Sequence, residues 1–243
     1  MREGDGQQAV ALFLSQSNVK PNTASRTALR VALRRAAHQL LDDPLVFTDA
    51  LALLIIGADE RAALAADPRA FDARRWDRSL RAFIAARSRL VEDELADAVA
   101  GGVRQYVVLG AGLDTFAYRN PHPTLRVFEV DYPATQIWKR ERLQAANIPL
   151  PESVVFAAVN FETEALSDRL RDAGFDAEAP AFLSWLGVVP YLGAQAVSAT
   201  LRWRSGAAAP YDRRVRLRNP AGEPRRAGAR GVQRGGRPVG RRR

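Results

Sequence analysis

The stretch Gln105-Tyr-Val-Val-Leu-Gly-Ala-Gly112 decides the fold class of this 243-residue chain. A short apolar run leads directly into two glycines, a pattern typical of a buried strand that ends in a tight turn. A second strand is predicted at 125–131 and ends in Asp131. Small residues let a backbone approach a nucleotide closely, and an acid at the end of the next strand can accept hydrogen bonds from ribose hydroxyls. The two stretches together favour a nucleotide site over a plain glycine turn.

The pattern around these two stretches alternates between strands and helices. Further strands are predicted at 154–159 and 181–186, and helices are predicted at 133–146, 162–173 and 193–203. Apolar residues recur at helical spacing before the first strand, within 23–41 and 76–100, with a further apolar stretch at 44–56. The sequence therefore predicts an α/β fold with a parallel sheet.

We expect three regions along the chain. Residues 1–101 form an N-terminal helical cap region, residues 102–203 form a Rossmann-like core, and residues 204–243 form a basic tail. The high net charge of +9 belongs to that tail, because residues 202–243 contain 14 arginines and only two acids, whereas the rest is slightly acidic. Its arginine-rich, weakly apolar composition predicts disorder, and it limits any nucleic-acid binding to non-specific contacts of the tail.

Composition excludes several other kinds of protein. The chain has no cysteine, which excludes disulfide scaffolds, thiolate zinc sites, iron–sulfur clusters and cysteine nucleophiles. It has two histidines, His38 and His122, too few for a histidine-rich metal site, and we predict no metal. No apolar run approaches the roughly 18 residues of a membrane span. We therefore expect a cytoplasmic protein with no membrane partner.

Six separated stretches of sequence indicate a more specific function. The stretches Leu109-Gly-Ala-Gly-Leu-Asp-Thr115 (followed by Tyr118-Arg119) and Phe128-Glu-Val-Asp-Tyr-Pro133 closely resemble the leucine carboxyl methyltransferase family, in particular its bacterial S-adenosylmethionine-dependent O-methyltransferases. Supporting stretches lie at 25–28, 35–44, 86–89 and 184–192, so the resemblance runs from about residue 25 to residue 203. It implies a Rossmann-like class I methyltransferase sheet that uses S-adenosyl-L-methionine to methylate a small-molecule carboxylate or hydroxyl.

The resemblance also implies roles for particular residues in cofactor binding. Arg87 would pair with the methionyl carboxylate, a role that suits the two-pronged guanidinium. Gly110 and Gly112 would lie under the cofactor, and Asp131 would hold its ribose. Asn160-Phe161 stand where the family usually has Asp-Leu beside the adenine, so that contact is expected in altered form.

Substrate contacts are expected from the N-terminal helices and from Ser184, Trp185 and Tyr191. Leu186 stands where many relatives have a glutamate. Trp185 then has two readings, either an aromatic wall for the sulfonium or a packing residue of the core. No catalytic base is identified. An ionised carboxylate acceptor needs none, whereas an alcohol or phenol would benefit from one. His38 is expected to pack or cap.

Two other functions remain open at this point. A nucleotide-dependent Rossmann oxidoreductase is one, although Thr115 and Phe116 stand where its third glycine would be. The other is an inactive protein whose arginine-rich tail binds nucleic acid. The resemblance stops near residue 203, and the residues beyond it have the composition of a GC-rich gene read out of frame. We therefore expect a frameshift or truncation that removes the C-terminal strands of the fold and impairs activity.

Overall fold

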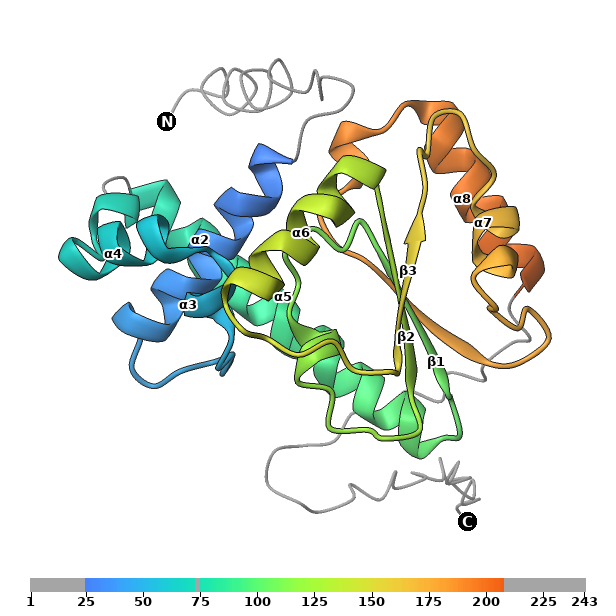
Figure 1. The fold of residues 1–243 in the computed structure, drawn as a ribbon, viewed down its shortest axis with the longest axis horizontal. Coiled ribbons are helices and arrows are strands. Elements are labelled where there is room, and N and C mark those ends of the chain that lie inside the picture. Colours follow the sequence, from blue (N-terminus) through green and yellow to red (C-terminus); the bar gives the residue numbers. More distant parts are fainter. Residues whose placement is uncertain (1–24, 73–74, 208–243) are drawn as a thin grey trace, which may run out of the picture. The chain divides into compact units, whose positions relative to one another are not determined.

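The computed structural model of the chain describes residues 25–72 and 75–207 (Figure 1). These residues all lie within one compact unit. The expectations for the tail, namely its disorder and the loss of further strands, lie outside them. The described part of the tail is the end of one helix.

A four-stranded parallel sheet forms the centre of the fold. Its strands are β1 (Gln105–Leu109), β2 (Arg126–Asp131), β3 (Val154–Ala158) and β4 (Ala181–Trp185). Their order in the sheet is β3-β2-β1-β4, and all three neighbouring pairs are parallel. Each strand lies within one residue of its predicted bounds, so the predicted fold class is confirmed.

Seven α-helices are described, three of them after the strands and four before the sheet. The first group is α6 (Pro133–Ala145), α7 (Leu166–Asp172) and α8 (Ala194–Ala207), and the second is α2 (Arg26–Leu41), α3 (Ala52–Ile55), α4 (Ala58–Ala66) and α5 (Arg75–Ala100). Three short 3-10 turns are η1 (Ala70–Asp72), η2 (Phe116–Tyr118) and η3 (Val189–Tyr191). Among the described helices, none is long and apolar enough to cross a membrane.

Helices cover both faces of the sheet, which explains why the strands are apolar throughout. Tyr106 and Val108 of β1 pack in one cluster with Leu95 of α5. Their neighbours Val107 and Leu109 point to the other face and pack with Leu170 of α7. Figure 1 shows α5 and α6 on one side of the sheet and α7 and α8 on the other. Strands buried on both faces are the expected arrangement in a parallel sheet.

The helices before the sheet pack on a separate apolar cluster. Buried residues of α2, α3 and α4, including Ala36, Ile55 and Leu64, form it. The side chain of Ser25 begins α2 by accepting a hydrogen bond from the Ala28 N–H at 3.1 Å, a typical N-cap. We call α2, α3, α4 and the segments between them the helical cap.

The strand order positions a site. In the sheet, β1 lies between β2 and β4. From the carboxyl end of β1 the chain runs toward one side of the sheet, and from the carboxyl end of β4 it runs toward the other. Ligands of open parallel sheets bind in the crevice outside the strand ends at such a switch point. The crevice expected here lies between the glycine turn after β1 and the segment after β4.

Candidate functional site

A cavity of about 390 Å³ opens at this position. Its lining comes from the segments that follow all four strands, together with α2 and α5. The residues predicted for the cofactor all line it, namely Arg87, Gly110, Gly112, Asp131, Asn160 and Phe161, and so do the predicted substrate contacts Ser184 and Tyr191. The structure therefore brings together residues that are up to 104 positions apart in sequence, from Arg87 to Tyr191.

Both glycines of the turn after β1 have conformations that other residues rarely adopt. The φ angle is +67° at Gly110 and +48° at Gly112. A Cβ on Gly110 would lie 2.1 Å from a methyl carbon of Val188, and one on Gly112 would lie 3.0 Å from the Cβ of Ala28. The turn can therefore pass close to both α2 and the segment after β4 only because these residues lack a side chain.

Asp131 is fixed by the backbone at the end of β2. Its Oδ2 accepts a hydrogen bond from the Gly112 N–H at 2.6 Å, and its Oδ1 accepts one from the Tyr132 N–H at 2.7 Å. Burial raises the pKa of Asp131, and the two backbone hydrogen bonds oppose that rise. Each carboxylate oxygen has a further lone pair. The side chain is thus oriented to accept hydroxyl donors from a ligand in the cavity.

Arg87 lines the cavity and forms no salt bridge among the described residues. It is half-buried, and its Nε is buried and has no hydrogen-bond partner in this part of the chain. Burial lowers the pKa of Arg87, the positive charge of Arg35 lowers it further, and the negative charge of Asp114 opposes both effects. Gly187 allows the close approach, since a Cβ there would lie 2.8 Å from the Arg87 guanidinium. A guanidinium in such surroundings would be stabilised by an anionic group of a ligand.

Adjacent residues of β4 point to opposite faces of the sheet. The Ser184 hydroxyl lies 2.8 Å from the Tyr106 hydroxyl, and both residues line the cavity. Trp185, one position later, packs instead with the α7 side of the core. Unlike Ser184 and Tyr191, Trp185 is not among the residues that line the cavity. Of the two readings of Trp185, these contacts favour packing in the core.

His38 lies away from the cavity and has partners of its own. Its Nδ1 is 2.5 Å from Oδ2 of Asp42, and its Nε2 accepts a hydrogen bond from the Phe47 N–H at 3.2 Å. This agrees with the packing or capping role expected for it. His122, in the loop before β2, is not among the residues that line the cavity either.

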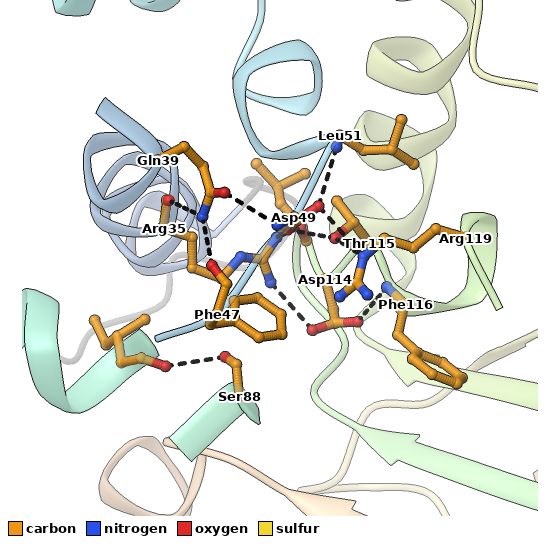
Figure 2. A network of polar contacts seen from close by, with 12 residues as sticks. Arg35, Gln39, Phe47, Asp49, Leu51, Ser88, Asp114, Thr115, Phe116 and Arg119 are labelled. Carbon is orange, nitrogen blue, oxygen red and sulfur yellow. Dashed lines mark hydrogen bonds and ion pairs between the residues drawn. The ribbon is translucent and has the colours of Figure 1, made fainter. Parts of the chain in front are cut away.

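The site also contains a group of charged residues that was not predicted from the sequence. Five charged side chains alternate in sign behind and along the cavity wall, in the order Asp114, Arg35, Asp49, Arg119 and Glu92. We call them the acid–arginine chain. Figure 2 shows the first four of them. Asp114 and Arg119 lie in motifs that carry the family resemblance, but no spacing in the sequence indicates that they meet Asp49 or Glu92.

Charges within the acid–arginine chain shift one another's pKa values. Burial would raise the pKa of Asp114, but Arg35 and other nearby cations hold it below the ordinary value. Burial raises the pKa of Glu92, and its hydrogen bonds with Arg119 oppose that rise. Burial would lower the pKa of Arg119, yet Glu92 and Asp49 raise it above the ordinary value. These groups therefore serve one another as partners.

Comparison with known proteins identifies the family of the chain. The model of the leucine carboxyl methyltransferase family matches residues 28–205. A Bacillus subtilis (strain 168) protein named "Putative S-adenosyl-L-methionine-dependent methyltransferase YktD" is 34% identical over 197 residues, which cover 72% of this chain and 64% of the relative. A Mycobacteroides abscessus protein named "Putative S-adenosyl-L-methionine-dependent methyltransferase" is 36% identical over 195 residues, covering 77% of this chain and 62% of the relative. The chain thus spans less than two thirds of the length of these relatives.

Proposed function

The chain belongs to the leucine carboxyl methyltransferase family, and from this premise we propose that it binds S-adenosyl-L-methionine in the cavity and methylates a small-molecule carboxylate. The observation that carries the proposal is the pairing of two groups in one cavity. Asp131 presents a backbone-oriented carboxylate to hydroxyl donors, and Arg87 presents a half-buried guanidinium that has no ion pair among the described residues.

The residues present fit this cofactor. Gly110 and Gly112 line the cavity with backbone alone, and a side chain would clash with Val188 at the first position and with Ala28 at the second. Asp131 would hold the ribose hydroxyls, and Arg87 would hold the carboxylate of the methionyl group. Asn160 and Phe161 would contact the adenine. When bound, the cofactor supplies a methyl group that is already activated by a positively charged sulfur.

The protein's own task is then to hold the acceptor in line and to exclude water. The wall formed by α2 and α5 contributes apolar side chains to the cavity, among them Val31, Ala32 and Val91. These exclude water from the acceptor side. The paired hydroxyls of Tyr106 and Ser184 add polar contacts to this part of the wall.

The acids of the described lining support a carboxylate acceptor, because each already has a donor within the protein. These pairs are Glu92 with Arg119, Asp114 with Arg35, Asp131 with the Gly112 N–H, and Glu162 with the Gly193 N–H. No histidine is among the lining residues that the structure describes. An alcohol would need a free base, whereas a carboxylate with a pKa of about 4 is ionised at neutral pH without one.

Methyl transfer can be tested with labelled cofactor. The full chain is incubated with methyl-labelled S-adenosylmethionine and an extract of small acidic metabolites, with the Asp131→Ala variant as the control. We expect the wild-type protein to label a product that releases volatile methanol in base, because methyl esters hydrolyse and ethers do not. A base-stable product would contradict the carboxylate and indicate a hydroxyl acceptor. Equal labelling by the wild type and the variant would contradict the assigned site.

A further inference from the structure

We propose that Asp49 is a positioning residue that couples the helical cap to the glycine turn of the cofactor site. The proposal rests on the function proposed above. Asp49 is not among the residues that line the cavity, so it would act through neighbours that are. Figure 2 shows it at the centre of the polar network, in the helical cap and next to the segment that follows the glycine turn.

Asp49 lies in the irregular segment between α2 and α3, and its side chain is fully buried. Its Oδ2 accepts a hydrogen bond from the Thr115 hydroxyl at 2.6 Å, and its Oδ1 accepts one from the Leu51 N–H at 3.1 Å. Thr115 is itself fully buried and follows Gly112 by three residues. One carboxylate therefore ties the helical cap to the glycine-turn segment.

Asp49 also holds the middle place in the acid–arginine chain. It lies 3.5 Å from the Arg35 guanidinium and 3.3 Å from that of Arg119. Each of these arginines has one other acid, Asp114 for Arg35 and Glu92 for Arg119. Without the charge of Asp49, each arginine would keep only one acidic partner, and the Thr115 hydroxyl would no longer donate to a charged acceptor.

The contacts reach the backbone of the cofactor site by two routes. Arg35 donates a hydrogen bond to the Leu113 carbonyl at 2.8 Å, directly after Gly112. Thr115, bonded to Asp49, fixes the same segment two residues further on. The Gly112 N–H in turn orients the carboxylate of Asp131. Asp49 thus sets the position of the turn on which the ribose contact depends.

A role in positioning differs from a role in stability. Buried ion pairs contribute little net stability, because the cost of removing charges from water offsets much of their attraction. If Asp49 only helped the protein to fold, its loss would affect ligand affinity no more than the loss of another buried acid that pairs with an arginine. Asp72 is that acid. Its side chain is almost fully buried and pairs with Arg81, and no contact joins it to the glycine turn within the described residues.

The first test compares Asp49→Asn with Asp72→Asn in the full chain. Both changes keep the side-chain shape and remove one buried charge. We expect Asp49→Asn to weaken the binding of S-adenosylhomocysteine about tenfold and Asp72→Asn to leave that binding unchanged. The two variants should lose a similar amount of melting temperature. Wild-type affinity in Asp49→Asn, or equal losses in both variants, would overturn the proposal.

A second pair of variants decides the matter if Asp49→Asn does not fold. Thr115→Val keeps the side-chain volume but removes the hydroxyl that donates a hydrogen bond to Asp49, whereas Thr115→Ser keeps that hydroxyl. We expect Thr115→Val to weaken the binding of S-adenosylhomocysteine and Thr115→Ser to retain the wild-type affinity. Equal affinities of the two variants would overturn the proposal. Where Asp49→Asn does fold, a double-mutant cycle should show that Thr115→Val adds little to its loss of affinity.

Amide hydrogen exchange separates this proposal from the proposed function, because it needs no ligand. Exchange at residues 110–115 of the free protein should become faster in Asp49→Asn and stay unchanged in Asp72→Asn. If the wild type fails to bind S-adenosylhomocysteine but this difference appears, the function is wrong and the coupling stands. If the wild type binds and exchange does not differ, the coupling is wrong.

Discussion

Replacing Asp131 by alanine is expected to weaken S-adenosylhomocysteine binding about 10- to 150-fold. Hydrogen bonds to charged groups contribute roughly 1.5–3 kcal/mol each, and the change removes the contacts proposed for the ribose. It also removes the acceptor that holds the Gly112 N–H at 2.6 Å, so the glycine turn would lose its anchor. Isothermal titration calorimetry on the full chain measures the effect.

The control for this variant is Asp93→Ala. Asp93 is an exposed acid on α5 that pairs with Arg89 on the same helix, and such surface pairs contribute little. Its loss should leave the affinity unchanged. An Asp131→Ala variant that binds as tightly as Asp93→Ala would refute the ribose assignment.

Replacing Arg87 by alanine is expected to cost as much affinity and yet little stability. A two-pronged guanidinium–carboxylate contact is among the stronger polar interactions, and its loss should weaken binding by at least about tenfold. Arg87 has no ion pair among the described residues, and burial lowers its pKa. Removing a half-buried charge that forms no salt bridge among the described residues should therefore lower the melting temperature of the ligand-free protein only slightly.

The matched control is Arg89→Ala, on the same helix two residues further on. Arg89 is more than half exposed and pairs with Asp93 at 2.7 Å. Its loss should change neither affinity nor melting temperature. Lysine at position 87 should restore only part of the affinity, because it cannot donate in the same forked geometry. If Arg87→Ala and Arg89→Ala lost affinity equally, the carboxylate clamp would be wrong.

The sheet could be predicted from sequence because its strands are apolar on both faces and end in recognisable turns. The run 105–109 passes directly into the glycine turn, and β2 ends in the acid that had been singled out. Residues at the carboxyl ends of neighbouring parallel strands must share one edge of the sheet. For that reason the residues named after β1, β2 and β3 all line the cavity.

Helix boundaries were less predictable where side chains take over backbone hydrogen bonds. The helix expected from residue 162 begins at Leu166. Asn160 accepts from the Glu162 N–H, and Glu164 accepts from the Asn160 N–H, so these residues form a side-chain-bonded turn instead. The apolar stretch at 44–56 is likewise helical only at 52–55, because Gln39 bonds to the backbone of Phe47 and Asp49.

Contacts between distant segments could not be predicted from one sequence. Asp49 and Thr115 are 66 residues apart, and nothing in either local pattern indicates that they meet. Trp185 shows the same limit at short range, because an alternating strand has two faces and the sequence does not say which one borders the cavity. Arg87 came from the family resemblance alone, since on sequence grounds it is one of many helical arginines.

The central claim is that the cavity at the switch point is a site for S-adenosylmethionine rather than for a dinucleotide. A calorimetric titration of the full wild-type chain with S-adenosylhomocysteine, and separately with NAD, tests it most directly. We expect saturable binding of S-adenosylhomocysteine at one site per chain. We expect no binding of NAD, because Thr115 and Phe116 stand where a pyrophosphate would need a glycine. Saturable binding of NAD without binding of S-adenosylhomocysteine would contradict it.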